Sequence, residues 1–555
     1  MSDEASTAGT KKNYRLFQIK CPDVLLSCSP TPESQCFLYT IDMIPTFDAN
    51  DENLKVFHNL YSTEHKFAIL TTKKLPKLGS MRFYLTFGEV CVTINHLPHG
   101  VQLSSQAEIM RLRNFHAMLF KDLLNTTAPF LAYDFQNNDN SYFIVPIVGK
   151  QINWQMVNAF QSLSTVKSVD EAVRKRLTFN PDDLLHKMVT PFYRSDQDQR
   201  YVVTKIHQDL SPSTRFPNSN YKDYSQYYYE KYGQRITNPH QFLIEVKGVT
   251  THLNRLVPGN KMDGSKNNIR IIEYMVPELC HNFKFPGDLY LKATLLPSTL
   301  HRLHYLLHAE TVRQTINTFI GNYVDYSPEP VLNSVIAKKQ MNDNELDAQE
   351  EVEKNHVKGN KLSIDELEEP KDLIRNLPVL YNDEIDYYYD FINDAVKNML
   401  INEEQQAPNP VSKCFDLASI DELPEIKFKA CTKDIIELLK IKMDTPTRGP
   451  RQCDLLAAIT SKTSSDVFDM ERLEVIGDAF LKFGASLFLL REHPTWHEGF
   501  LSNVKGKLVS NRNLCYIAID MGINMIVKVN NFLPKSGWIP PLFAVPQAVQ
   551  VIHFC

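Results

Sequence analysis

Residues 468–482 read FDMERLEVIGDAFLK. Three of their acidic residues lie at helical spacing: Glu471, Glu474 and Asp478. Asp469 is a good N-cap residue and Glu471 suits the positive end of a helix dipole, so a helix is predicted to begin here. On that helix Glu474 and Asp478 lie one turn apart, with Glu471 beside them. Like charges at this spacing weaken a helix by about 0.2 to 0.5 kcal/mol, and a bound cation would remove the repulsion. Hard oxygen ligands favour Mg²⁺.

A plainer interpretation makes these acidic residues an ordinary solvated helix face. Arg472 and Lys482 would then be their local ion-pair partners. Gly477 favours the functional interpretation, because a glycine in mid-helix costs about 1 kcal/mol relative to alanine. Such a glycine suggests that another backbone or helix approaches closely at that position.

A competing metal site lies downstream, at His493, His497 and Glu498. These residue types can bind zinc. However, Pro494 interrupts any helix through them, and the sequence has no HExxH arrangement. Zinc is therefore not the metal that we expect at this end of the chain.

Aromatic residues crowd a second segment, between residues 192 and 229. Stacking on such rings holds nucleic-acid ends and contributes about 1 to 3 kcal/mol per base. The plainer alternative is packing, since a tyrosine hydroxyl can reach water while its ring is buried. The residues concerned are Phe192, Tyr193, Arg194, Phe216, Tyr221, Tyr224, Tyr227, Tyr228 and Tyr229.

The elements that would position these residues form several units. A chain of 555 residues that is 43% hydrophobic is long enough for about three or four domains. Strand-like runs over 36–94 precede a helical pattern over 107–124, which predicts a helix on a sheet. Prolines divide 191–280 into short pieces typical of a compact, mostly β module. Residues 298–310 predict a helix, and the charged segment 337–370 predicts a flexible acidic linker.

The composition says more about the cellular compartment of the protein than about what the protein binds. The net charge of -5 argues against a uniformly basic binder, although 60 Lys and Arg can still form local basic faces. The ten cysteines include no CxxC pair, which favours reduced thiols inside the cell. The polar start lacks the features of a secretory signal, and the most apolar stretch, 480–490, contains Lys482. We expect a cytoplasmic protein that does not cross a membrane.

Residues 471–478, ERLEVIGD, resemble the signature of ribonuclease III. The segments 497–499 and 501–514 that follow resemble the first ribonuclease III domain of animal Dicers. The resemblance implies that Glu474 and Asp478 bind the metal and that Glu498 lies near a dimer contact. It implicates four residues in catalysis: Glu471, Glu474, Asp478 and Glu498. Three further residues are candidates to face RNA phosphates, or else merely solubilise the surface: Lys505, Lys507 and Arg512.

The aromatic segment resembles the PAZ domain of Dicers over about residues 190–285. In that family an aromatic pocket receives the two-base 3′ overhang of an RNA duplex. The residues that match the pocket, its adjoining Tyr-Arg pair and its closing motif VPELC are Phe216, Tyr227, Tyr228, Tyr193, Arg194 and Glu278. Residues 67–124 resemble the platform of Dicers, particularly of insects, and 297–310 resemble the connector helix.

These resemblances predict a multidomain α+β protein. It would have a β-rich platform, a small mostly β PAZ module, a connector helix and an incomplete all-α ribonuclease III domain. The chain has no Asp or Glu after Asp520, so the family's second acidic pair is expected to be absent and the sequence to be a fragment. The expected division is 1–13 tail, 14–135 platform, 136–285 PAZ (core 190–285), 286–325 connector helix, 326–412 charged linker and 413–555 partial ribonuclease III domain.

The leading functional prediction is an endoribonuclease of RNA interference that processes double-stranded RNA into small RNAs. It would anchor the 3′ overhang and hydrolyse the backbone with Mg²⁺ or Mn²⁺. Its expected partners are RNA, a second ribonuclease III domain in cis or in trans, and a double-stranded-RNA-binding helper protein. One alternative is a catalytically incomplete module that only binds RNA ends. Another is an Argonaute-type guide binder, which the ribonuclease III signature argues against.

Overall fold

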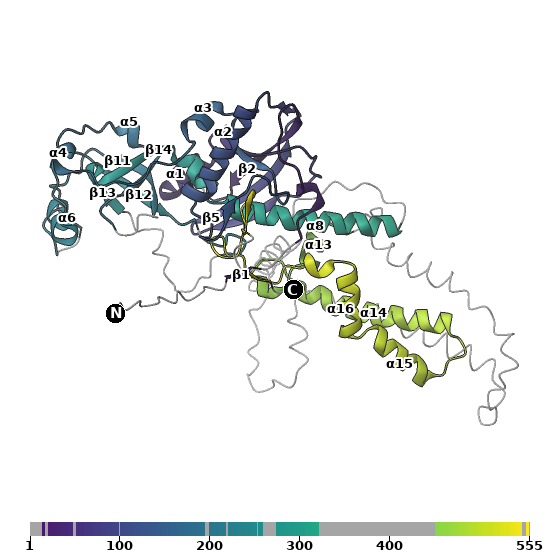
Figure 1. Ribbon diagram of the computed structural model, residues 1–555. Coiled ribbons are helices and arrows are strands. Elements are labelled where there is room, and N and C mark those ends of the chain that lie inside the picture. Colours follow the sequence, from purple (N-terminus) through teal and green to yellow (C-terminus); the bar gives the residue numbers. More distant parts are fainter. Residues whose placement is uncertain are drawn as a thin grey trace, which may run out of the picture. The chain divides into compact units, whose positions relative to one another are not determined.

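The computed structural model divides the chain into two compact units, and the first comprises residues 1–338 and 448–555 (Figure 1). The expected tail, the charged linker and residues 413–449 lie outside the described residues. Those described all belong to the first unit. They are residues 14–16, 20–47, 51–98, 100–194, 199–217, 220–251, 253–258, 273–320, 450–546 and 551–553.

An antiparallel sheet forms the first domain, in the order β4-β5-β2-β3-β8-β9, with β6 paired to β2. Its central strands are nearly continuous apolar runs, so both faces are covered. The strands are β2 (Gln35–Pro45), β3 (His65–Thr71), β4 (Met81–Leu85), β5 (Gly88–His96), β6 (Val101–Gln102), β8 (Phe143–Val148) and β9 (Gln151–Ile152).

The helix predicted over 107–124 is present as α2 (Gln106–Ala117), which continues into a wider turn over Met118–Leu123. Its start is explained by Ser105, whose side chain accepts a hydrogen bond from the Glu108 N–H. Ile109, Leu112 and Phe115 are buried, so this helix covers the sheet as its pattern predicted. The other helices of this region are α1 (Glu52–Tyr61) and α3 (Trp154–Ala159).

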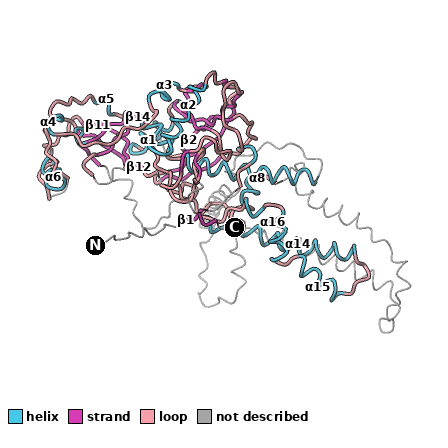
Figure 2. The backbone as a smooth tube through the Cα atoms, viewed as in Figure 1, coloured by secondary structure: helices cyan, strands magenta, loops and turns pink. Residues whose placement is uncertain are grey.

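A five-stranded antiparallel sheet forms the second domain, in the order β13-β12-β11-β10-β14 (magenta in Figure 2). The expected mostly β module is therefore present. Its strands are β10 (Lys187–Pro191), β11 (Arg200–His207), β12 (Leu243–Val249), β13 (Glu273–Met275) and β14 (Cys280–Pro286). Its helices are α4 (Glu171–Arg174), α5 (Pro181–Leu184) and α6 (Tyr224–Tyr232).

The boundary between these two domains differs from the expected one. Strand β8 pairs with β3 of the first sheet, from Leu70 opposite Phe143 to His65 opposite Val148. Residues 143–152 thus belong to the platform, although the predicted boundary at 135 assigned them to the PAZ module. Strand order depends on pairing between distant segments, which a local pattern of residues does not reveal.

The connector helix α8 (Leu296–Ile320) follows the short helix α7 (Gly287–Ala293) and confirms the helix predicted over 298–310. Leu300, Leu303, Leu306 and Leu307 are buried in the main hydrophobic core, as their spacing predicted. That core also includes residues of the first sheet and of the C-terminal region. The connector is thus a packed core element and no free-standing spacer.

The C-terminal part is helical, as expected for a ribonuclease III domain. Its helices are α13 (Gln452–Ala458), α14 (Glu471–Glu492), α15 (Glu498–Leu508) and α16 (Asn511–Asp520). Short strands complete the fold: β15 (Phe543–Ala544) pairs with β7 (Ala132–Tyr133), and β16 (Val551–His553) with β1 (Tyr14–Leu16). Mixed sheets and helices confirm the predicted α+β class. No helix among the described residues is long and apolar enough to span a membrane.

Candidate functional site

The aromatic residues of the second domain gather on and around α6. This helix begins after Asp223, whose carboxylate accepts a hydrogen bond from the Gln226 N–H at 2.8 Å, and ends at Gly233, with φ of 65°. Helical geometry turns Tyr228 into the core, where it is 1% exposed, and leaves Tyr227 half-buried at the rim. Tyr228 therefore supports the pocket while Tyr227 can contact a ligand.

The rings form a contiguous cluster. Phe216 stacks on Tyr227, with ring centroids 4.5 Å apart and planes 18° apart. Tyr193 meets Tyr228 edge-to-face at 5.4 Å and Tyr232 at 4.7 Å. The structure thus brings together four residues predicted for this site, from three separate segments. Offset and edge-to-face pairs of this kind hold the rings in place before any ligand binds.

The Tyr-Arg pair lies beside these rings but is already engaged. Arg194 forms an ion pair with Glu273, and its guanidinium donates to the Tyr201 hydroxyl at 2.6 Å. Although burial opposes the charge, the hydrogen bond with Glu273 raises the pKa of Arg194. The Tyr193 hydroxyl is buried without a hydrogen-bond partner among the described residues. Because this hydroxyl is enclosed, Tyr193 supports the ring cluster from within in the described conformation.

Glu278 has a structural position that the sequence did not predict. Its side chain is 0% exposed. Its carboxylate accepts hydrogen bonds from the Thr237 N–H at 2.7 Å, the Thr237 hydroxyl at 2.6 Å and the Asn238 N–H at 3.3 Å. Direct contact between this side chain and RNA is therefore excluded in the described conformation, because the carboxylate is enclosed and its bonds hold the 237–238 loop.

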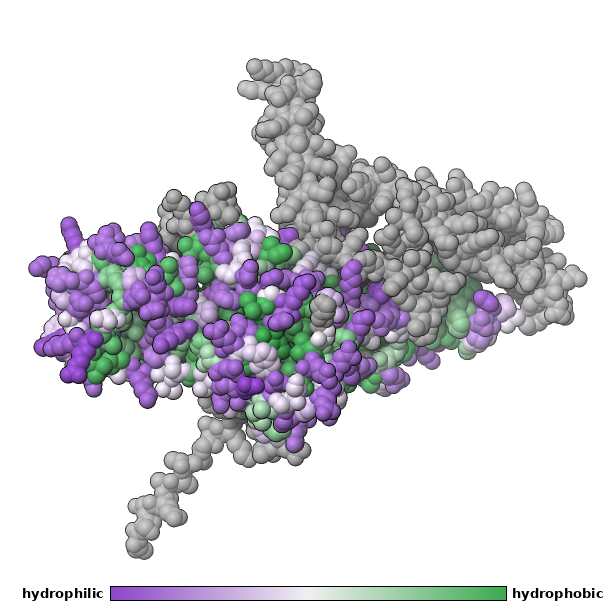
Figure 3. All heavy atoms as spheres, turned by 90° about the horizontal axis from the view of Figure 1, so that it is seen from above, coloured by the Kyte–Doolittle hydropathy of each residue, from purple (hydrophilic) through white to green (hydrophobic). Residues whose placement is uncertain are grey.

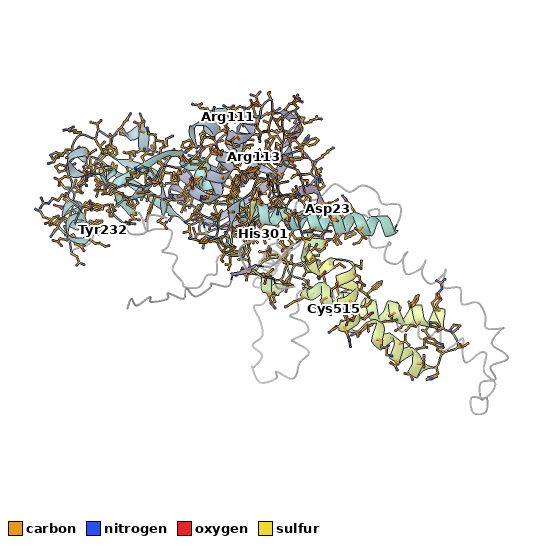
Figure 4. All side chains as sticks on the ribbon, viewed as in Figure 1. Asp23, Arg111, Arg113, Tyr232, His301 and Cys515 are labelled. Atoms are coloured by element: carbon orange, nitrogen blue, oxygen red, sulfur yellow. The ribbon has the colours of Figure 1, made fainter. Side chains whose placement is uncertain are left out.

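Two residues of the cluster were missed by the sequence argument. Lys231 donates to the Tyr227 hydroxyl at 3.2 Å, and the Tyr227 and Tyr232 hydroxyls are 3.5 Å apart (Tyr232 is labelled in Figure 4). Burial alone would raise the pKa of Tyr232, but Tyr227 and the charges of Arg194 and Lys231 lower it. Spacing could have found both, because each lies four residues after a predicted pocket tyrosine on one helix.

The carboxylate helix α14 exists, but its start differs from the prediction. Met470 occupies the N-cap position, and Asp469 instead accepts a hydrogen bond from the Glu471 N–H at 3.1 Å. No described residue approaches Gly477, where an added Cβ would meet nothing within 4 Å, so the close approach stays a prediction. Apolar side chains at helical spacing form a stripe on α14 that is exposed as well, with Ile476 at 69% and Phe480 at 74%; its other members are Leu473 and Leu481.

The acidic side chains of α14 lie in solvent and partly pair with lysines. Lys482 lies 2.6 Å from Asp478, and Lys462 lies 2.9 Å from Glu471. The ion pair between Lys482 and Asp478 is one that the interpretation as a solvated helix face predicts. Glu474 and Asp478 lie one turn apart on the helix. Because Mg²⁺ is commonly held by one or two carboxylates with several waters, this pair suits part of such a site.

Other predicted ligands remain separate from that pair. Glu498 begins α15, where it accepts a hydrogen bond from Ser502 at 3.4 Å. His493 stacks on Trp496 at 3.6 Å, and His497 caps α15. In the part of the chain that the structure describes, no three His, Cys, Asp or Glu side chains are close enough to share a metal ion. The structure therefore gathers neither a complete carboxylate site nor the alternative zinc site.

The predicted phosphate-facing residues lie on α15 and α16. Lys505 and Lys507 form no ion pair among the described residues, which leaves both ammonium groups available. Arg512 lies over the Tyr516 ring and donates to its hydroxyl at 3.3 Å. Figure 3 shows hydrophilic and apolar side chains side by side over the molecular surface. The two lysines are thus the better candidates for phosphate contact.

A buried ion triad joins the connector helix to the region of the carboxylates. The side chain of Asp466 is fully buried, and its two oxygens lie 2.6 Å from Arg302 of α8 and 2.7 Å from Lys528. Burial would raise the pKa of Asp466, but the two cations hold it below its usual range. Because Asp466 lies just before α14, the triad fixes the start of that helix against α8.

Three family models match successive parts of the chain. The Dicer platform domain matches residues 29–153, the PAZ domain matches 160–306 and the ribonuclease III domain matches 471–548. A platform of the Dicer type on the same chain as a ribonuclease III domain decides between the families considered. The chain belongs to the Dicer family.

Named relatives agree with this assignment. Endoribonuclease Dicer of Gallus gallus is 25% identical over 666 aligned residues, which cover 99% of this Dicer-family chain and 34% of that protein. Endoribonuclease Dcr-1 of Drosophila melanogaster is 30% identical over 346 residues, covering 58% of this chain and 15% of that protein. The chain thus spans about a third of the length of the Gallus gallus relative.

Among solved structures, Dicer from Giardia intestinalis is similar at 13% identity and a TM-score of 0.30, covering 48% of this chain and 36% of that one. The family assignment therefore rests on the sequence matches. Within the Dicer family, the aromatic cluster lies in the PAZ match and α14 begins the ribonuclease III match. The two sites described above thus have family counterparts.

Proposed function

We propose that this Dicer-family chain recognises the 3′ end of double-stranded RNA and contributes to its endonucleolytic cleavage. The observation that carries the proposal is the preformed cluster of Phe216, Tyr227, Tyr193 and Tyr228 within the PAZ region. A base of the overhang stacks on the Tyr227 and Phe216 side of the cluster, and Tyr193 supports these rings from within.

Cleavage is assigned to the exposed carboxylates of α14. Glu474 and Asp478 hold the divalent cation, for which Mg²⁺ is the proposed ion, and Lys505 and Lys507 position the RNA backbone. A bound cation of this kind acidifies water and stabilises charge on a phosphoryl oxygen. For Asp478 to act, its ion pair with Lys482 must open. The lysine is then free for a phosphate.

A second ribonuclease III domain is the proposed partner at α14. The exposed stripe that includes Ile476 and Phe480 supports this, because a large apolar surface left in water favours association. A double-stranded-RNA-binding helper protein and a cytoplasmic location, where RNA interference would be carried out, belong to the same proposal. They rest on the family resemblance and on the absence of a CxxC pair among the cysteines.

One observation favours a second candidate function. Among the described residues no third metal-binding side chain stands beside Glu474 and Asp478. A chain with only this pair would bind RNA ends without cutting them. The two functions differ in a single property, which is turnover of a bound duplex.

The test is cleavage of an end-labelled duplex with a two-nucleotide 3′ overhang by the purified chain, with Mg²⁺. Changing both Glu474→Gln and Asp478→Asn should slow cleavage about a hundredfold or more while binding persists, because several kcal/mol of charge stabilisation is lost. Glu492→Gln, an exposed carboxylate at the other end of α14, is the matched control. Cleavage that survives the double change would refute the catalytic assignment. Overhang-dependent binding by the unaltered chain without cleavage would establish the end-binding function instead.

A further inference from the structure

Three histidines lie along the connector helix α8 at positions 301, 304 and 308 (His301 is labelled in Figure 4). The spacing of three and four residues places them on one face of the helix. None of them belongs to the aromatic pocket or to the carboxylate helix. The part of α8 that they occupy contacts the segment around Lys20 and the region around Phe532.

His304 and His308 direct the same ring nitrogen to one point. Their Nε2 atoms are 3.3 Å apart, and they lie 3.0 Å and 2.7 Å from the Lys20 carbonyl oxygen. Two nitrogen ligands at about 2.0 to 2.1 Å from a tetrahedral zinc ion lie about 3.3 to 3.4 Å apart. The pair therefore has the spacing of two ligands of one metal ion before any metal is bound.

The surroundings keep both rings in the form that binds metals. Burial lowers the pKa of His304 to about 3 and that of His308 to about 4, although the Lys20 carbonyl opposes the shift for each. Both imidazoles are thus neutral near pH 7, and neutral imidazole is the ligand form. A metal ion would therefore meet uncharged rings, and the one proton of each ring would move from Nε2 to Nδ1 when Nε2 binds the metal.

A cavity of about 120 Å³ adjoins His304 and supplies space for further ligands. His301 also lines it, together with Asn140, Tyr142 and Trp538. The Nε2 atom of His301 is buried and has no hydrogen-bond partner among the described residues. A cavity of this size with polar groups in its lining can hold several water molecules, and an unsatisfied nitrogen on a lining residue is a site for one of them.

We propose that His304 and His308 bind one divalent transition-metal ion of the Zn²⁺ class. The Lys20 carbonyl oxygen is placed to be a third ligand after a shift of a few tenths of an ångström, and a water molecule from the cavity completes the site. His301 accepts or donates a hydrogen bond to that water. Imidazole ligands select Zn²⁺, Cu²⁺ or Ni²⁺ over Mg²⁺, so this site is chemically distinct from the carboxylates of α14.

The site would fasten the N-terminal segment to the connector helix. The Lys20 N–H already donates to the Met525 carbonyl at 3.1 Å, so Lys20 links α8 with the C-terminal region. Without a metal, the two histidines would only donate hydrogen bonds to Lys20. A metal titration therefore distinguishes a metal site at His304 and His308 from a pair of hydrogen bonds to the Lys20 carbonyl.

The test uses the untagged, metal-free full chain in excess Mg²⁺, which occupies carboxylate sites. Calorimetric titration should detect one Zn²⁺ site that His304→Gln and His308→Gln each weaken about tenfold or more. The matched control is His58→Gln, a half-exposed histidine on α1, which should leave the affinity unchanged. Equal Zn²⁺ affinity in the unaltered chain and in folded His304→Gln and His308→Gln variants would overturn the proposal.

A spectroscopic measurement covers the case in which these variants do not fold. One equivalent of Cu²⁺ added to the unaltered chain should give an electron paramagnetic resonance spectrum with splitting from two imidazole nitrogens. A spectrum without imidazole coupling, or the lack of one stoichiometric site, would refute the assignment of His304 and His308.

Discussion

Neighbouring tyrosines on α6 have different roles because the helix turns them in different directions. Tyr228 is buried and its hydroxyl donates to the Tyr274 carbonyl at 3.3 Å, so it belongs to the core of the second domain. Tyr227 stacks on Phe216 at the rim. A substitution of Tyr227 should therefore mainly weaken RNA binding, whereas a substitution of Tyr228 should mainly destabilise the second domain.

Tyr227→Ala should weaken binding of a duplex with a two-nucleotide 3′ overhang, because loss of base stacking costs about 1 to 3 kcal/mol. Tyr229→Ala is the matched control, since this tyrosine lies on the same helix and is 51% exposed. Fluorescence anisotropy with overhanging and blunt duplexes measures both affinities. If the two variants bind the overhang equally well, Tyr227 is not part of the pocket.

At this scale the sequence predicted the aromatic residues better than the polar ones. Phe216 stacks on Tyr227 and Tyr193 packs on Tyr228, while the role of these residues in RNA binding stays a prediction. Glu278 was predicted to bind RNA, yet it binds the 237–238 loop. The partner of Arg194 is Glu273, which is 79 residues away. Residue type indicates what a side chain can bind, whereas its actual partner depends on strand pairing over long distances.

Among the elements, the connector helix depends on the buried triad at Asp466. Burial lowers the pKa of Lys528 to about 8 even though Asp466 opposes this, so the lysine is costly to bury without its partner. Asp466→Asn should lower the free energy of unfolding by about 3 to 5 kcal/mol, because two buried cations lose their counter-charge. The half-exposed Asp454, paired with Arg451, provides the control substitution Asp454→Asn. If chemical denaturation gives the two variants equal free energies of unfolding, the role of the triad is contradicted.

His116 gives a second link between elements, with a predictable pH dependence. Its Nδ1 accepts from the Ile144 N–H and its Nε2 donates to the Pro541 carbonyl, each at 2.9 Å. Burial lowers its pKa from 6.5 to about 4, although both hydrogen bonds oppose the shift. Between these values the unfolded chain binds a proton that the folded chain does not, so acid favours unfolding.

Stability should accordingly be complete above pH 6.5 and fall by about 1.4 kcal/mol per pH unit through this group as the pH approaches 4. His116→Gln should show a smaller loss, because an amide does not titrate. Melting temperatures of both proteins between pH 7 and pH 4.5 test this. His58→Gln serves as the control, and identical pH profiles for the unaltered chain and His116→Gln would refute the assignment.

Elements with a local signal were predictable from the sequence, and their packing was not. The leucine spacing of α8 and the apolar pattern over 107–124 predicted both helices. Nothing local indicated that β15 pairs with β7, 410 residues or more earlier in the chain, or that β8 joins the first sheet. The close approach expected at Gly477 is not made by any described residue and stays a prediction.

On the scale of the whole molecule, the proposed function assigns RNA contacts to two regions, the aromatic cluster of the PAZ region and the lysines of α15. Lys505→Gln with Lys507→Gln should lower the slope of log affinity against log salt by about two, since about one counterion is released per phosphate contact. The effect should appear with long duplexes and vanish with duplexes that reach only the pocket. The exposed Lys535 provides the control, Lys535→Gln. An unchanged slope on long duplexes would contradict phosphate contact by α15.

The division into a platform, a PAZ module, a connector helix and a helical nuclease region was predictable, because each has its own hydrophobic period and signature residues. The net charge of -5 predicted little, since RNA contacts depend on a few local side chains. Assembly with a second ribonuclease III domain depends on surfaces of another molecule or segment and stays a prediction.

The most direct test of end recognition is photo-crosslinking of a duplex that carries 5-iodouridine in its 3′ overhang, followed by mass spectrometry of the joined peptide. Recognition by the aromatic cluster predicts crosslinks within residues 193–232, centred on Phe216 and Tyr227, that disappear when the label is moved to a blunt end. Crosslinks confined to α14–α16, or equal yields from blunt and overhanging ends, would contradict it.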